Sequence, residues 1–137
     1  RVIFTPGDRY ATCLWNGIRV GIGSDVGGGT SLSLLANLAD AYKIQQLRGT
    51  SLDPFQALYL ATLGGARALD LDGLVGNFLP GREADFVALD LAATPMIAQR
   101  MEHARGLADT LFVLNTLGDD RAVAETWVMG ERRHAKG

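Results

Sequence analysis

The chain has 137 residues, and its 13 basic and 15 acidic side chains give a net charge of −2. A hydrophobic fraction of 47% with 20% charged residues is typical of a globular protein and argues against a disordered chain. The slightly acidic balance does not favour nucleic acid as a partner. The longest uncharged stretch, residues 26–39, is too short and too rich in Gly, Ser and Thr to span a membrane. A single cysteine, Cys13, excludes an internal disulfide and a CxxC metal motif.

Charge and composition divide the chain near residue 70. Residues 1–69 contain six Lys/Arg and four Asp/Glu, whereas residues 70–137 contain seven and eleven. The first part has the pattern strand, loop, helix, helix, and the second has short strands around a helix. The sequence therefore predicts an α/β fold in which an α/β piece is joined to a β piece.

The first part begins with a short predicted strand. Apolar residues alternate over residues 18–22, and the strand is expected to end at Ser24–Asp25. Three glycines follow, and Thr30 or Ser31 is the expected N-cap of a helix that ends at Gly49. The apolar stripe of this helix consists of Leu34, Leu35, Leu38, Ala41 and Tyr42. The stretch 1–16 shows no clear strand that would precede this one.

Further elements follow from cap, turn and periodicity signals. Asp53 before Pro54 is a cap followed by a first helical turn, and predicts a helix that runs towards Gly64–Gly65. The other expected elements, in chain order, are a helical stretch at 66–69, a turn at 80–81, a buried strand at 84–90, a helix from Thr94–Pro95, a helix at 107–117 and a terminal hairpin at 124–133.

Asp25 is the residue with the most chemical interest. It stands where a hydrophobic strand ends and a glycine-rich loop begins, before a helix. In parallel α/β folds the carboxyl ends of strands carry the active site, and a carboxylate there can bind a metal or move protons. Position and residue type alone nevertheless favour a loop aspartate that caps nearby amides.

Other candidate residues have weaker signals. The place of the P-loop lysine is taken by Gly29, so phosphate binding at the helix N-terminus is an open but unspecific alternative. His103 and His134 are far apart in the sequence and form no HxH or HExxH motif, so both are expected on the surface. Cys13, Trp15 and Trp127 are expected to serve packing.

Four stretches together resemble the C-terminal part of the amidohydrolase superfamily, and its guanine deaminases most closely. They are residues 21–30 (GIGSDVGGGT), 57–69 (ALYLATLGGARAL), 76–87 (GNFLPGREADFV) and 117–128 (LGDDRAVAETWV). The third stretch is general to the superfamily, and the first and fourth are typical of guanine deaminases. The resemblance covers roughly residues 17–130, and the stretch 1–16 contributes little to it.

The resemblance implies the C-terminal part of a (β/α)8 metal-dependent hydrolase barrel plus part of a small composite β domain. Residues 1–70 would be the end of the barrel, with its last strand, the metal-ligand loop and the following helices. Residues 71–137 would be the C-terminal part of the composite β domain with its helices. The parts that complete both units would lie outside this chain.

The activity implied by the resemblance is the zinc-dependent hydrolysis of guanine to xanthine and ammonia in purine catabolism. Asp25 maps onto the family aspartate that binds or approaches the zinc and shuttles protons, which reverses the assignment made from its position alone. The family's histidine ligands and the residues that bind the base have no counterpart here, so the substrate-binding residues are unknown. The resemblance also implies a cytoplasmic enzyme and a homodimer.

The chain is accordingly expected to be an inactive fragment, with no tightly bound zinc of its own. Its partner would be the N-terminal portion of the same protein, and without that portion its open strand edges would favour self-association. Two alternatives remain open: a fragment of a related amidohydrolase acting on cytosine, adenosine-type or triazine rings, and a non-catalytic α/β binding module. An HxH motif upstream of residue 1 would exclude the second of these.

Overall fold

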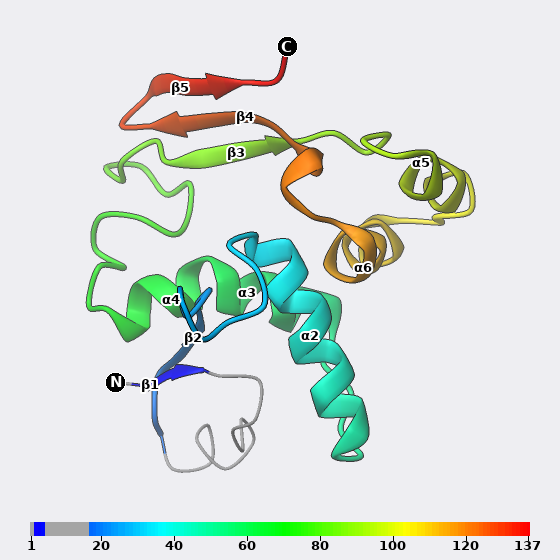
Figure 1. The fold of residues 1–137 in the computed structure, drawn as a ribbon. Coiled ribbons are helices and arrows are strands. Elements are labelled where there is room, and N and C mark those ends of the chain that lie inside the picture. Colours follow the sequence, from blue (N-terminus) through cyan, green and yellow to red (C-terminus); the bar gives the residue numbers. More distant parts are fainter. Residues whose placement is uncertain (1, 5–16) are drawn as a thin grey trace.

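The structure is a computed structural model that describes residues 2–4 and 17–137 (Figure 1). Cys13 and Trp15, for which packing roles were expected, lie outside the described residues. The elements, in chain order, are β1 (Val2–Phe4), β2 (Val20–Ile22), α2 (Leu34–Leu47), α3 (Pro54–Ala61), α4 (Leu63–Ala68), β3 (Phe86–Leu89), α5 (Pro95–Met101), α6 (Leu107–Leu117), the 3-10 helix η1 (Asp120–Ala122), β4 (Val123–Val128) and β5 (Glu131–Ala135).

A parallel pair of strands opens the fold. β1 pairs with β2 in the register Val2–Val20, Ile3–Gly21 and Phe4–Ile22. Every residue of β2 is buried, as is usual for parallel strands covered on both faces. The sequence shows no clear match for a preceding strand in the stretch 1–16, and the structure places one at Val2–Phe4. Three residues are too few to show a periodicity of two, and only the pairing with β2 defines β1.

Helix α2 begins later than the sequence predicts. Its N-cap is Ser33 rather than Thr30 or Ser31, and the Ser33 side chain makes no capping hydrogen bond. The two expected caps have other roles, because Thr30 donates to Asp40 and the Ser31 hydroxyl accepts from the Ser33 amide. The predicted end at Gly49 is confirmed, since this glycine has a φ of +76° directly after the C-cap.

Helices α3 and α4 are two short helices separated by Thr62. The Asp53 carboxylate accepts hydrogen bonds from the Phe55 and Gln56 amides, which confirms the predicted cap. Thr62 has φ −125° and ψ −105°, and α4 then starts at Leu63, three residues before the predicted helical stretch. The main core cluster combines buried residues of β2, α2 and α3 with one residue of the loop before α3: Val20, Ile22, Leu38, Ala41, Leu52, Ala57 and Leu60.

The second part of the chain contains an antiparallel sheet in the order β3–β4–β5. The predicted hairpin is confirmed: Met129 and Gly130 connect β4 to β5 with φ values of +53° and +77°, as a two-residue type I′ turn requires. Phe86 stacks on Trp127 with ring centroids 5.5 Å apart, so the packing role predicted for Trp127 is also confirmed.

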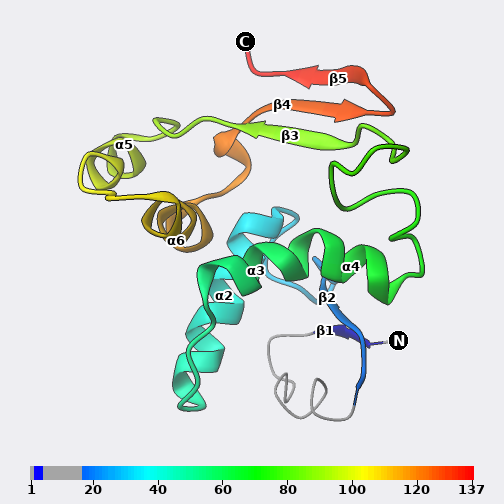
Figure 2. The ribbon, with the colours of Figure 1, turned by 180° about the vertical axis from the view of Figure 1, so that it is seen from behind.

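Helices α5 and α6 lie between β3 and β4 in the sequence, and α6 joins the two parts of the chain. The Thr94 hydroxyl caps α5, and α6 has the predicted bounds. Asn115 of α6 donates to the Pro54 carbonyl of α3 at 3.0 Å, and Phe112 packs edge-on against Tyr42 of α2. Figures 1 and 2 show α3 and α4 between the β3–β5 sheet on one side and the β1–β2 pair on the other.

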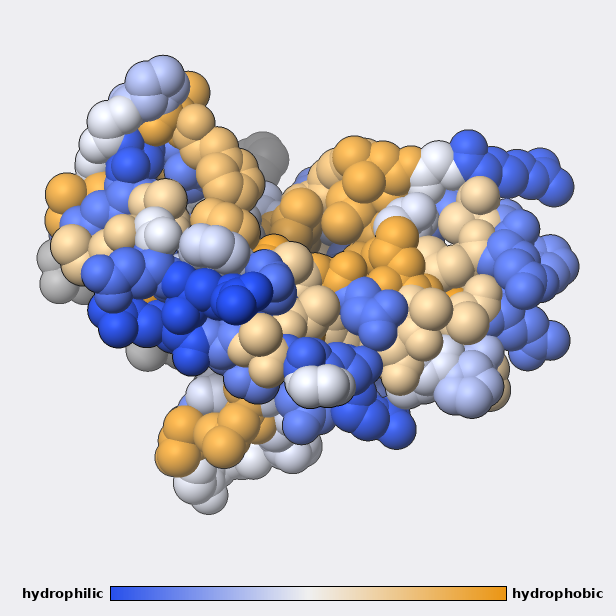
Figure 3. Space-filling model, turned by 90° about the horizontal axis from the view of Figure 1, so that it is seen from above, coloured by the Kyte–Doolittle hydropathy of each residue, from blue (hydrophilic) through white to orange (hydrophobic). Residues whose placement is uncertain are grey.

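Many large apolar side chains remain exposed on both parts of the chain. Val26, Leu32, Leu47, Phe78 and Met129 are more than two-thirds exposed. Figure 3, which looks down on the molecule from above, shows apolar residues gathered in patches beside hydrophilic bands on that face.

Candidate active site

The loop between β2 and α2 carries the main candidate residue. We call residues 23–33 the Asp25 loop. Asp25 lies three residues beyond the carboxyl end of β2 and has a φ of +48°, which is unusual for a residue other than glycine. Its carbonyl accepts hydrogen bonds from the Gly28 and Gly29 amides at 2.9 and 2.5 Å. The backbone therefore turns back on itself immediately after Asp25.

Two glycines make this turn possible. A Cβ on Gly29 would lie 1.8 Å from the Ser24 carbonyl oxygen, which no side chain can tolerate. A Cβ on Gly28 would lie 2.9 Å from Oδ2 of Asp25. Because these two positions have no side chains, the turn can close and the space beside the Asp25 carboxylate stays open.

The Asp25 carboxylate itself is exposed. Among the hydrogen bonds and ion pairs of the described residues, none involves its side chain. From its position, the Asp25 side chain was expected to accept hydrogen bonds from nearby amides. The structure shows that the Asp25 backbone carbonyl accepts them instead. The carboxylate is left available for a ligand.

The far end of the Asp25 loop is bound to α2. The Thr30 hydroxyl donates to Oδ2 of Asp40 at 2.6 Å, and the Asn37 amide group donates to the Ser31 carbonyl at 3.0 Å. The hydrogen bond from Thr30 is the main reason that the pKa of Asp40 lies below its ordinary value, with Lys43 adding to the effect and partial burial opposing it. Sequence reasoning missed Asp40, because contact across the loop is visible only in three dimensions.

The two histidines are exposed, as predicted, and neither belongs to this loop. His103 follows α5 and its Nδ1 lies 3.1 Å from the Gln99 carbonyl oxygen, whereas His134 lies on the edge strand β5. Within residues 2–4 and 17–137, no three His, Cys, Asp or Glu residues form a group that could hold a metal.

A shallow cavity of about 220 Å³ lies beside α5 and α6, away from the Asp25 loop. It is lined by Arg100, His103, Ala104, Asp109, Phe112 and Val113. Asp109 already accepts from the Arg105 amide at 2.9 Å. The cavity contains no residue that the sequence singled out beyond His103.

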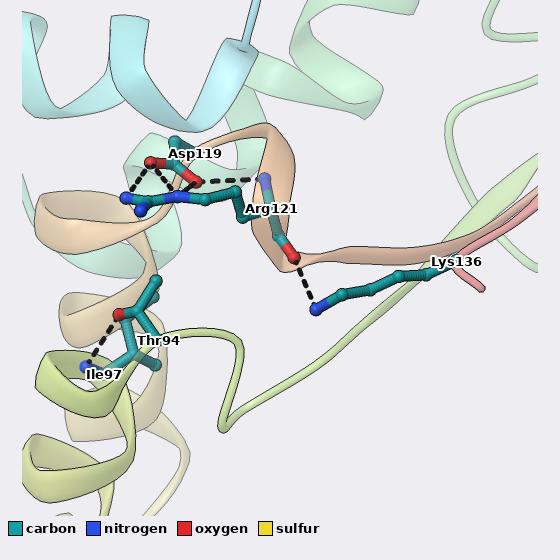
Figure 4. Close-up of polar contacts among 5 residues, drawn as sticks. All are labelled: Thr94, Ile97, Asp119, Arg121 and Lys136. Carbon is teal, nitrogen blue, oxygen red and sulfur yellow. Dashed lines mark hydrogen bonds and ion pairs between the residues drawn. The ribbon is translucent and has the colours of Figure 1, made fainter.

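The stretch 117–128 places a charged cluster at the junction of α6 and the sheet (Figure 4). Arg121 donates to both carboxylate oxygens of Asp119, with a shortest distance of 2.6 Å. The guanidinium of Arg121 is the main reason that the pKa of Asp119 lies below its ordinary value. Lys136 donates to the Arg121 carbonyl and to Asp90. This cluster therefore binds the end of β5 to the segment between α6 and β4.

Barrel enzymes carry their active-site residues at the carboxyl ends of parallel strands, and Asp25 lies beyond such an end. The sequence profile of the amidohydrolase family matches residues 9–133, and the chain belongs to that family. In the described residues, no helix is long and apolar enough to cross a membrane.

The particular relatives are guanine deaminases. Guanine deaminase of Escherichia coli is 51% identical over 113 residues, which are 82% of this chain and 26% of that protein. A probable guanine deaminase of Deinococcus radiodurans is 46% identical over 117 residues, covering 83% of this chain and 27% of the relative. The solved E. coli guanine deaminase superposes with a TM-score of 0.95 at 42% identity, over 98% of this chain and 34% of that one.

These comparisons confirm the resemblance to guanine deaminases and the barrel-hydrolase fold expected from the four sequence stretches. The chain spans about a quarter of the length of the curated relatives that it matches.

Proposed function

We propose that this chain is the C-terminal portion of a zinc-dependent guanine deaminase, which hydrolyses guanine to xanthine and ammonia. The observation that carries the proposal is the 51% identity to a guanine deaminase over 82% of this chain. Position also supports it, because the exposed Asp25 carboxylate stands beyond the carboxyl end of a parallel strand, where barrel enzymes carry their catalytic residues.

The proposed organisation assigns residues 1–70 to the end of the barrel and residues 71–137 to the small β domain. The parallel pair β1–β2 with α2 to α4 supports the first assignment, and the antiparallel β3–β5 sheet supports the second. Helix α6 packs on α2 and α3 although it belongs to the second segment, so it would join the two units.

The described residues do not form a zinc site by themselves. Zinc takes about four nitrogen, sulfur or oxygen ligands, and the Asp25 loop offers one carboxylate. Bound zinc would lower the pKa of a coordinated water molecule towards neutrality. In the complete enzyme we assign to Asp25 a position at the metal and the transfer of a proton between the attacking water and the leaving amine. The other ligands would come from outside this chain.

Two further features belong to the proposal. The complete enzyme would be cytoplasmic, in keeping with a role in purine catabolism, and it would be a homodimer. Its N-terminal portion would complete both the barrel and the β domain.

The test uses the full-length gene product that contains this chain. We expect it to convert guanine to xanthine, measured by the change in ultraviolet absorbance and by ammonia release, and to leave cytosine and adenosine unchanged. Asp25→Ala should lower kcat by about a thousandfold or more, since a group that moves protons at the reacting centre contributes on this scale. The far-ultraviolet circular dichroism should stay unchanged, because the Asp25 side chain is exposed and makes no hydrogen bond or ion pair with the described residues.

Asp72→Ala is the matched control, because within the described residues this partly exposed carboxylate has a single partner, Arg67, in an ion pair of 3.8 Å. We expect it to keep near-normal kcat. Near-normal guanine hydrolysis by Asp25→Ala would contradict the role assigned to Asp25, and hydrolysis of another heterocycle in place of guanine would contradict the substrate.

A further inference from the structure

The Asp25 loop is anchored differently at its two ends. At its first end it continues from β2, whose residues Val20 and Ile22 are 3% and 8% exposed. At its second end it leads to α2, whose first turn has no side-chain cap. The second end therefore has to be fixed by other contacts of the loop with α2.

Between its ends the loop is held by the two backbone hydrogen bonds to the Asp25 carbonyl. All residues from 25 to 30 are exposed, and three of them are consecutive glycines. Glycine has more conformational freedom to lose than any other residue, so an unanchored loop of this composition would populate many conformations. The hydrogen bonds to the Asp25 carbonyl form only when the loop adopts the turn.

The structure supplies an anchor in Thr30. Its hydroxyl lies 2.6 Å from Oδ2 of Asp40, a short distance typical of a hydrogen bond to an ionised carboxylate. Asp40 is a rigid acceptor because its neighbours on α2, Leu38, Ala39 and Ala41, are at most 7% exposed. The hydroxyl that the sequence suggested as a helix cap thus binds the loop to the second turn of the helix.

The second contact at this end of the loop does not depend on the side chain at position 31. The Asn37 side chain donates to the Ser31 carbonyl, which any residue at position 31 would present. The Thr30 contact instead needs a hydroxyl at position 30 and an acceptor at position 40. It joins two side chains, so Thr30→Val removes it and Thr30→Ser can restore it.

We propose that Thr30 and Asp40 are positioning residues that hold the Asp25 carboxylate in its reactive place. The inference rests on the proposed function and adds to it a pair of residues that act through the position of Asp25. Loss of the hydrogen bond frees the loop and misplaces Asp25, which slows the chemical step without changing the binding of the base. The predicted signature is a fall in kcat at nearly constant KM.

The experiment compares Thr30→Val, Thr30→Ser, Asp40→Ala and the double variant Thr30→Val/Asp40→Ala in the full-length gene product. Valine keeps the shape of threonine without the hydroxyl, and serine keeps the hydroxyl. We expect Thr30→Val to lower kcat about tenfold with KM changed less than about twofold, because small misplacements at a reacting centre have effects of this order. Thr30→Ser should restore kcat, and the double variant should lose no more than either single variant.

Thr116→Val is the matched control. The Thr116 hydroxyl donates to the Phe112 carbonyl at 2.6 Å within α6, so this variant loses an equally short hydrogen bond away from the loop. We expect its kcat to stay unchanged.

Amide hydrogen exchange supplies a readout that does not depend on activity. Exchange at Gly28 and Gly29, whose amides donate to the Asp25 carbonyl, should become faster in Thr30→Val and return to normal in Thr30→Ser. Unchanged exchange in Thr30→Val would overturn the proposal. So would normal kcat in Thr30→Val, or a fall in kcat that Thr30→Ser does not restore.

The two proposals fail in different ways. If the unmodified gene product does not hydrolyse guanine, the proposed function fails, and hydrogen exchange still decides whether Thr30 orders the loop. If Asp25→Ala is inactive and Thr30→Val is fully active, only the positioning role fails.

Discussion

The region formed by β2 and helices α2 to α4 and the region formed by the antiparallel sheet bury their side chains to very different extents. β2 is buried along its whole length, and Leu38 and Leu60 of the helices beside it are each 1% exposed. By contrast, β3 and β4 are mostly half-buried and every residue of β5 is exposed. The first region therefore has a cluster of buried side chains, whereas the apolar side chains of the sheet are only partly buried.

The difference follows from how each region forms its strands. The β4–β5 hairpin is local and needs only a two-residue turn, so it can form without much burial. A parallel pair needs a long connection, and burial of its strands by helices stabilises it. In the proposed complete enzyme, the sheet would gain its cover from residues outside this chain.

The largest stability effect is expected in the core of the first region. Leu60→Ala removes a side chain that is 1% exposed and leaves a cavity in the cluster with Val20 and Leu38. We expect the free energy of unfolding to fall by about 2–5 kcal/mol in urea denaturation.

Val87→Ala on β3 is the comparison from the sheet, because Val87 is 51% exposed. It should lower the free energy of unfolding by less than about 1 kcal/mol. An equal fall in the free energy of unfolding for the two variants would mean that side chains of the sheet are buried to the same extent as those of the core. It would contradict the contrast between the two regions.

A medium effect is expected at the helix caps of the first region. Asp53 accepts hydrogen bonds from two amides of α3, at 2.9 and 3.3 Å, so Asp53→Ala should lower the free energy of unfolding by about 1 kcal/mol. Ser33→Ala is the matched variant at the N-cap of α2, where the side chain makes no capping hydrogen bond. Thermal unfolding should show a lower Tm for Asp53→Ala alone, and an equal fall for Ser33→Ala would contradict the role of the caps.

The smallest effect concerns pH at the junction between the regions. Since Arg121 lowers the pKa of Asp119 in the folded state, this pair stabilises the fold above the unfolded pKa of aspartate, about 3.9. That contribution is lost as the pH falls through the lower folded pKa. Urea midpoints measured from about pH 6 to about pH 3 should therefore depend less on pH in Asp119→Asn than in the unmodified protein.

Asp120→Asn is the control for this prediction. Among the hydrogen bonds of the described residues, none involves the Asp120 carboxylate, whereas Asp119 accepts from Arg121 through both oxygens. An equal change of the pH dependence in both variants would contradict the stabilising role assigned to the ion pair between Arg121 and Asp119.

Local signals in the sequence were sufficient where a few neighbouring residues decide the conformation. Asp53–Pro54 and Thr94–Pro95 begin helices as predicted, and Met129–Gly130 forms the predicted turn. Helix α6 has the predicted bounds because its apolar periodicity extends over eleven residues. The resemblance to amidohydrolases also came from local stretches of sequence, and the matching family confirms it.

Contacts between distant residues decided the rest. Strand β1 is defined by its pairing with β2, eighteen residues further along the chain, and no pattern in three residues reveals it. The start of α2 moved to Leu34 because Thr30 and Ser31 make other hydrogen bonds. Such partners lie outside the window that a propensity or a cap motif describes.

For the candidate site, the sequence determined that Asp25 stands at the end of an apolar strand before three glycines. Only the tertiary structure decided that its carbonyl closes the turn, that its carboxylate stays free and that Thr30 reaches Asp40 on α2. The physical reason is that a strand and a turn depend on neighbouring residues, whereas the direction of a side chain depends on packing across the fold.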